Sequence, residues 1–163
     1  MVEVDIQTVS IAFASAGVFL AAIYYIFQIR HQTRIRKTDL LTRLVSTYGS
    51  REYTKALMRV LALEFRDYDD FVEKYGPIPS LNPDTVAFRM ISIFGEELGM
   101  LLRRGLIDPD MTISIFSVGI LWEKLKPIVE GVRKHFNEPR LFEDFEYLYN
   151  EMKKREQKLQ SKA

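Results

Sequence analysis

The feature that most constrains this chain is a long stretch without a charged residue near its N-terminus, Ile6–Ile29. A bilayer core of about 30 Å needs roughly 20 consecutive apolar residues in an α-helix, and this stretch supplies them. A core helix of a globular protein rarely runs this long without a charge, because one of its faces usually meets water. The sequence therefore predicts one transmembrane helix over residues 8–29.

The flanks of this helix predict that it stays as an anchor, and they predict its orientation. Glu3 and Asp5 make the start acidic, whereas a cleaved signal peptide needs a basic start. Lys and Arg follow the apolar stretch at once, and such residues are held on the cytoplasmic side of a membrane. We expect a single-pass protein of the cell membrane, with residues 1–7 as a short extracytoplasmic N-terminus and the C-terminal domain in the cytoplasm.

Candidate membrane-interface residues flank the cytoplasmic end of the predicted span. Tyrosine rings favour the headgroup level, and the basic residues either attract anionic lipid, at roughly 1 kcal/mol per charge, or only fix the topology. The candidates are Tyr24, Tyr25, Arg30, Arg34, Arg36 and Lys37. Small residues inside the span would let two copies approach closely, so a homo-oligomer through the transmembrane helix stays open. They are Ser10, Ala14, Gly17 and Ala21.

Beyond the span, the spacing of apolar residues predicts an all-α chain. Residues 30–48 contain no proline or glycine and predict a basic juxtamembrane helix that continues the transmembrane helix. Residues 49–152 predict a helical-bundle cytoplasmic domain, and residues 153–163 a polar tail. No segment combines alternation of period two with turn signals, so we expect no sheet.

Two helix starts introduce the strongest apolar stripes, Asn82-Pro83-Asp84 and Asp108-Pro109-Asp110. The first predicts a helix with a core stripe at Ala87, Ile91, Phe94, Leu98 and Leu101. Its opposite stripe includes Arg89 and Glu96, which form either a solvated charged face or a buried functional pair. The second start leads to a stripe from Ile115 to Phe136 that keeps its register through Pro127.

The register across Pro127 predicts one kinked helix rather than two. Trp122 lies in the middle of this stripe, so we expect its indole in the core, packed on the Ala87-to-Leu101 face of the neighbouring helix. Short connections such as Gly105 to Pro109 usually leave consecutive helices antiparallel and in contact.

The composition disfavours several classes of function. The net charge of +1 gives no basic field for nucleic acid, and no cysteine is present. His31 and His135 are the only histidines, and neither follows a Glu at the spacing of a di-metal helix. The acidic patch Asp67, Asp69, Asp70 and Glu73 lacks the glycine turn of a calcium loop and predicts a solvated helix start. We predict no catalytic, cofactor-binding or metal-ligating residue, no cofactor and no nucleic-acid partner.

The segments "IFGEELGMLLRRGLIDPDM" and "LWEKLKPIVEGVRKHF" carry a resemblance. With the single span and basic juxtamembrane helix before them, they resemble a family of uncharacterised single-span membrane proteins of bacteria and archaea, a domain of unknown function. The matching positions are Phe94, Glu96, Gly99, then Gly105 to Asp108, then Trp122, Pro127 and Arg133. The resemblance implies a helical fold and a membrane location, and it implies no activity.

The sequence thus favours a membrane-anchored helical interaction or scaffold domain whose lipid partner is the bilayer and whose protein partner is unknown. The alternative is a membrane-bound enzyme or sensor with a helical pocket for a lipid or small metabolite. A closed cavity with converging polar groups would favour the alternative, and an apolar surface groove would favour the interaction domain.

Overall fold

The computed structural model describes residues 6–160, apart from the side chains of residues 7, 8 and 12. The described residues form seven helices and no strand, which confirms the all-α prediction. Residues 1–5 of the predicted extracytoplasmic N-terminus and residues 161–163 of the predicted polar tail lie outside the described range. The chain divides into two units, Met1–Leu41 and Thr42–Ala163.

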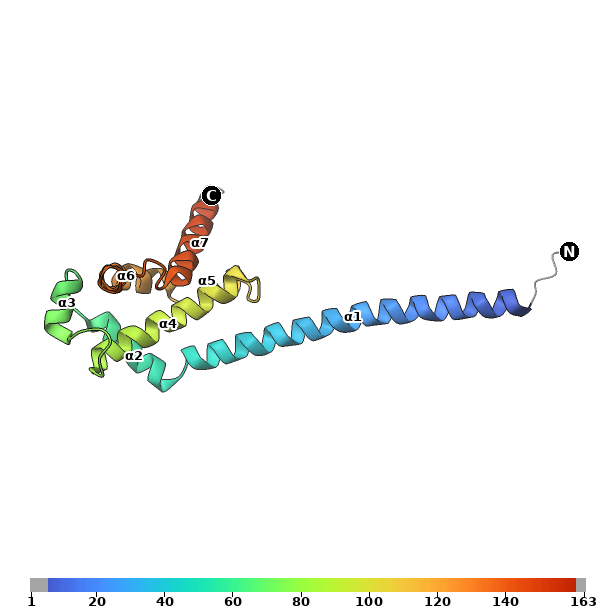
Figure 1. The fold of residues 1–163 in the computed structure, drawn as a ribbon, viewed down its shortest axis with the longest axis horizontal. Helices are drawn as coiled ribbons and strands as arrows, with labels where there is room; N and C mark the ends of the chain where they lie inside the picture. Colours follow the sequence, from blue (N-terminus) through green and yellow to red (C-terminus); the bar gives the residue numbers. More distant parts are fainter. Residues whose placement is uncertain (1–5, 161–163) are drawn as a thin grey trace. The chain divides into compact units, whose positions relative to one another are not determined.

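The first unit contains most of helix α1, which covers Ile6–Tyr48 (Figure 1). Between residues 9 and 29 every described side chain is exposed. This helix is long and apolar enough to cross a membrane. One continuous helix therefore carries both the predicted span and the predicted juxtamembrane segment.

The second unit begins with the last residues of α1 and contains the other six helices. They are α2 (Arg51–Ala62), α3 (Tyr68–Tyr75), α4 (Pro83–Arg103), α5 (Pro109–Ile115), α6 (Val118–Phe136) and α7 (Glu143–Gln160). Helix α4 is central: α7 and α2 pack along it, while α6 packs against α3 and α7. An aromatic cluster joins the end of α1 to this core, because the ring of Tyr48 lies 5.2 Å from that of Tyr53 and 5.0 Å from that of Phe116.

Local capping chemistry sets the helix starts, as the sequence predicts. The Asn82 side chain accepts a hydrogen bond from the Asp84 N–H at 2.9 Å, and the Asp108 side chain accepts one from the Met111 N–H at 3.0 Å. Each cap satisfies one of the N–H groups that a helix start leaves without an intrahelical partner.

The single kinked helix along the stripe from Ile115 to Phe136 is only partly confirmed. Pro127 lies inside one continuous helix, α6, but Ile115 ends a separate helix, α5. The break falls at Phe116, whose backbone is extended (φ −105°, ψ 134°). Its ring is buried and stacks edge-on against Phe94 at 5.6 Å. Burying a phenylalanine side chain contributes about 1.5–3 kcal/mol, whereas each hydrogen bond of a continuous helix would add about 0.5–1.5 kcal/mol.

Trp122 is buried, as the sequence predicts, with 2% of its surface exposed. Its aromatic contacts, however, are with α7: the ring centroid lies 5.1 Å from Phe145 and 6.2 Å from Tyr149. Helices α4 and α6 touch each other far less than either touches α7. The sequence predicts α4 as the main neighbour of Trp122, but the structure places α7 against its indole.

Candidate functional site

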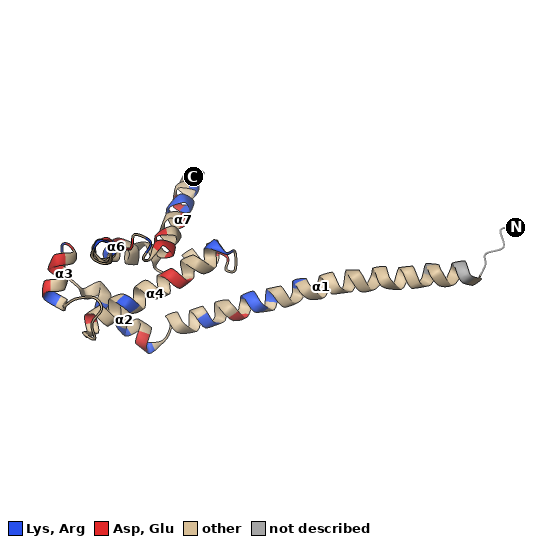
Figure 2. Cartoon of the chain, viewed as in Figure 1, with Lys and Arg blue, Asp and Glu red and all other residues tan. Residues whose placement is uncertain are grey.

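The predicted membrane-interface residues all lie on α1, in the first unit, and all are exposed. Figure 2 shows basic residues along the C-terminal half of this helix. The helical spacing places Arg30, Arg34 and Lys37 on one face of the helix and Arg36 on another, so three of the four cations form one stripe. Tyr24 and Tyr25 lie side by side with ring centroids 6.3 Å apart.

Two glycines of α4 allow α7 to approach this helix closely. A Cβ atom built on Gly95 would lie 2.6 Å from the ring of Phe145, and one on Gly99 would overlap the backbone carbonyl of Asp144. Both glycines are buried, and they are four residues apart on one face of α4. Only residues without a side chain leave room for the first turn of α7 at this place. We call Gly95, Glu96 and Gly99 the α7 seat.

Glu96 completes the α7 seat by capping α7 from outside. Its Oε2 atom accepts a hydrogen bond from the Phe145 N–H at 2.9 Å. A carboxylate also suits the positive end of a helix dipole. Partial burial raises the pKa of the Glu96 carboxyl above its ordinary range, and the hydrogen bond from Phe145 opposes part of that rise.

The α7 seat corrects the expectation for the polar stripe of α4. The solvated charged face holds at Arg89, which is exposed, but Thr85, Ser92 and Gly99 on the same side of α4 are buried, and α7 covers the C-terminal part of the stripe. Glu96 bonds to α7 and does not pair with Arg89. The stripe looked solvated because its residues are polar or small, yet small residues allow a second helix to approach.

Two arginines hold the first turns of α7 beside the seat. The Arg103 Nε lies 2.8 Å from the Asp144 carboxylate, and the Arg133 Nη1 lies 2.9 Å from that of Glu146. The Arg133 Nε also donates to the Leu141 carbonyl at 2.8 Å. Four of the residues that carry the resemblance, Glu96, Gly99, Trp122 and Arg133, therefore all lie against the start of α7.

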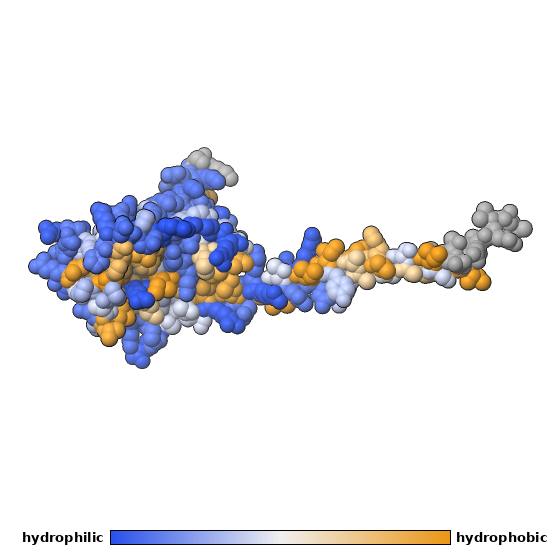
Figure 3. Space-filling view, in the orientation of Figure 1, coloured by the Kyte–Doolittle hydropathy of each residue, from blue (hydrophilic) through white to orange (hydrophobic). Residues whose placement is uncertain are grey.

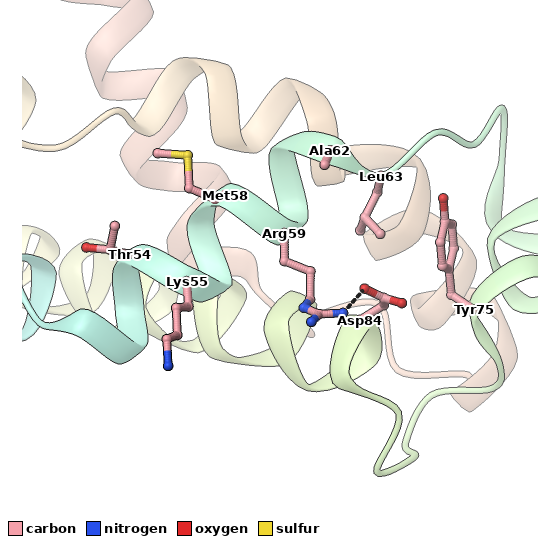
Figure 4. A pocket seen from close by; sticks show the side chains of 8 residues that line it. All are labelled: Thr54, Lys55, Met58, Arg59, Ala62, Leu63, Tyr75 and Asp84. Atoms are coloured by element: carbon pink, nitrogen blue, oxygen red, sulfur yellow. Dashed lines mark hydrogen bonds and ion pairs between the residues drawn. The ribbon is translucent and has the colours of Figure 1, made fainter.

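A hollow of about 650 Å³ runs along α2. Its lining includes Met58, Ala62 and Leu63, and the Arg59 guanidinium of α2 lies 3.0 Å from the Asp84 carboxylate of α4 (Figure 4). Lys55 lines the same hollow. The hollow is open to solvent, so we call it the α2 groove.

A second hollow of about 480 Å³ lies between α4 and the C-terminal end of α6. Its walls are Phe88 and Ile93 from α4 and Val132 and Phe136 from α6. Figure 3 shows apolar surface (orange) among the hydrophilic surface of the helical unit. We call this hollow the α4–α6 groove.

A third hollow, of about 470 Å³, is polar and includes Asp67, Asp69, Glu130 and His135. No group of His, Cys, Asp and Glu among the described residues is arranged to hold a metal ion. The acidic patch instead folds α3: Asp67 caps the helix at the Asp70 N–H, and Asp70 accepts hydrogen bonds from the Arg66 N–H and the Lys74 Nζ. These bonds lower the pKa of Asp70, that from Arg66 most strongly.

A comparison with known protein families matches most of the chain, including the residues of the α7 seat. A family model described as a domain of unknown function (DUF4760) matches residues 12–152. The chain belongs to the DUF4760 family. No curated protein and no solved structure shows significant similarity to it.

In this DUF4760 chain, the residues that sequence reasoning missed are those that act through α7. Gly95 lies between the matching residues Phe94 and Glu96 and carries no prediction of its own, and Asp144 is one of several acids in its segment. The usable signal was the four-residue spacing of Gly95 and Gly99, because glycines that share a helix face indicate a close helix approach.

Proposed function

We propose that this chain is a membrane-anchored helical interaction domain that acts as a scaffold or accessory subunit. In this proposal α1 is a single-pass span in a bacterial or archaeal cell membrane, with its N-terminus outside and the second unit in the cytoplasm. The apolar residues 9–29, followed by Arg30, Arg34, Arg36 and Lys37, support this orientation.

The observation that carries the proposal is the α2 groove. Its α2 side runs from Thr54 to Ala62, roughly 12 Å at 1.5 Å per residue. An amphipathic helix that docks through positions i, i+3, i+4 and i+7 needs roughly 10 Å of groove. Met58, whose surface is 58% exposed, offers an adaptable apolar contact in the middle.

The charges of the α2 groove specify the partner's chemistry. Lys55 makes no hydrogen bond or ion pair with any described residue, and Arg59 is already paired with Asp84. A partner helix with an apolar face and an acidic flank would complement this rim. The proposed occupant is therefore an acidic amphipathic helix of another membrane-associated protein.

An enzyme, or a sensor that encloses a lipid or metabolite, is the competing function. An enzyme or sensor of that kind requires a chamber that excludes water and brings polar groups together. A small space between Tyr53, Phe94 and Phe145 holds only about 10 Å³. The hollows of about 470, 480 and 650 Å³ are open to solvent, so none of these three encloses a ligand in this way.

Photo-crosslinking in native membranes tests the proposal. A benzophenone amino acid replaces Met58 in the full chain, and a matched variant carries it at Ile120, which is also exposed but lies outside the α2 groove. We expect one discrete adduct from position 58 and none from position 120. Lys55→Glu should weaken the adduct several-fold.

Equal adducts from both positions, or none from position 58, would contradict the interaction surface. An adduct with the mass of two chains would assign the α2 groove to a second copy. Anchoring is tested separately, because a chain that alkaline carbonate releases from membranes is not membrane-spanning.

A further inference from the structure

The α4–α6 groove differs from the α2 groove in chemistry. Of its ten lining residues, eight are apolar, and the two charged ones are Arg89 and Glu138. Glu138 accepts a hydrogen bond from the Arg140 N–H at 3.3 Å, so it has a local role. The walls otherwise present aromatic and branched aliphatic side chains, which is typical of a site for an apolar ligand.

Arg89 is the unused polar group of this groove. Its guanidinium is exposed and makes no hydrogen bond or ion pair with any residue in the described range. Arg59, Arg103 and Arg133 of the same unit, in contrast, all have carboxylate partners. A guanidinium binds carboxylate and phosphate oxygens in bidentate geometry. The groove therefore joins an apolar trough to one available anion-binding group.

The length of the groove limits what it holds. Helix α4 contributes Phe88 to Ile93, and α6 contributes Val132 to Phe136, roughly 6–8 Å of each helix. This is shorter than the roughly 10 Å that a docked partner helix needs. The volume of about 480 Å³ lies within the range of small-ligand sites.

We propose that the α4–α6 groove binds an anionic phospholipid through its headgroup, with the phosphate on Arg89 and the first few carbons of one acyl chain against the exposed side chains of Ile93 and Phe136. The inference goes beyond the proposed function, and it rests on membrane anchoring only for the supply of lipid. A bound lipid in an open groove requires no catalysis.

The test uses the full chain in phosphatidylcholine nanodiscs with a trace of a lipid carrying a diazirine in its acyl chain. One probe is phosphatidic acid and the other is phosphatidylcholine. After irradiation, mass spectrometry maps the labelled peptides. We expect the phosphatidic acid probe to label the peptides around Ile93 and Phe136 more strongly than the phosphatidylcholine probe does. Arg89→Ala should reduce this labelling roughly tenfold, as expected for the loss of a charge-assisted hydrogen bond.

Arg104→Ala is the matched control, because Arg104 is an exposed arginine at the end of the same helix and outside the groove. It should leave the groove labelling unchanged. Labelling of residues 9–29 reports anchoring independently, so a failure of the membrane span and a failure of the groove are distinguishable. Unlabelled groove peptides beside a labelled span would overturn the inference. Equal labelling by both probes that survives Arg89→Ala would overturn it as well, because the contact would then be a nonspecific membrane contact.

Discussion

The α7 seat can be tested by adding a single methyl group to it. In Gly99→Ala the new Cβ would overlap the Asp144 carbonyl, which is main chain and cannot rotate away. The first turn of α7 must therefore move. Such a move would stretch the 2.9 Å hydrogen bond from the Phe145 N–H to Glu96 and the 2.8 Å ion pair between Arg103 and Asp144.

The expected cost follows from these contacts. Overpacking a core position costs about 1–3 kcal/mol, and losing a hydrogen bond to a charged group costs about 1.5–3 kcal/mol. Alanine in place of a helical glycine returns about 1 kcal/mol of helix propensity. We expect Gly99→Ala to lower the free energy of unfolding by roughly 2–4 kcal/mol, a large share of the roughly 5–15 kcal/mol of a typical domain.

Gly119→Ala is the matched control, because it is also a helical glycine. Its Cβ would lie 2.6 Å from Cε of Met152, the end of a flexible side chain that can move aside. The assay is denaturant unfolding of the full chain in detergent, followed by the emission of Trp122, the only tryptophan. Trp122 contacts Phe145, so its emission reports the docking of α7. Equal midpoints for wild type, Gly99→Ala and Gly119→Ala would refute the close approach of α7 to α4.

Four further predictions concern the core, the carboxyl groups of Asp70 and Glu96, and the topology. Trp122→Ala should cost roughly 3–5 kcal/mol, measured by thermal unfolding, because the indole is buried. Asp70 has a lowered pKa, so its stabilisation should be lost as the pH falls through that pKa, and Asp70→Asn should flatten the acid limb of an unfolding-versus-pH curve. Glu96 has a raised pKa, so its contribution has the opposite sign, and the stability should fall as the pH rises through that pKa. Glu96→Gln keeps an acceptor for the Phe145 N–H and should remove this slope in the same measurement. Single cysteines at Val2 and Leu159 test topology in a chain without cysteine: an impermeant thiol reagent should label intact cells at position 2 only.

Local chemistry made much of the fold predictable. The starts at Asn82 and Asp108 are set within three residues by a side chain and an N–H group, so the sequence alone contains the cause. The apolar stripe of α4 was also predictable, and Ile91, Phe94 and Leu98 are buried. Leu101 is only partly buried and Leu102 is buried instead, because a helical pattern is uncertain by one residue near the end of a helix.

Contacts between distant segments were not predictable in the same way. The extended backbone at Phe116 depends on rings from α1 and α4, and Trp122 depends on α7 rather than on its neighbour in sequence. The interaction between Glu96 and Phe145 spans 49 residues. In each case the position of a side chain depends on a contact with a residue far away in the sequence. The local sequence pattern does not indicate which residue that is.

In helix α4, contacts with distant segments decide which side chains remain available for a ligand or partner. One face is covered by the core and the glycine face by α7, so few of its side chains remain for a ligand or partner. The remaining exposed strip includes Val86, Arg89 and Ile93. Arg89 is the cation on that strip, and the apolar groove opens beside it. The close packing of α7 therefore gives Glu96 a structural role as a cap. Arg89, in contrast, has a charge that no described residue pairs with, so it is the α4 residue that we expect to bind a ligand.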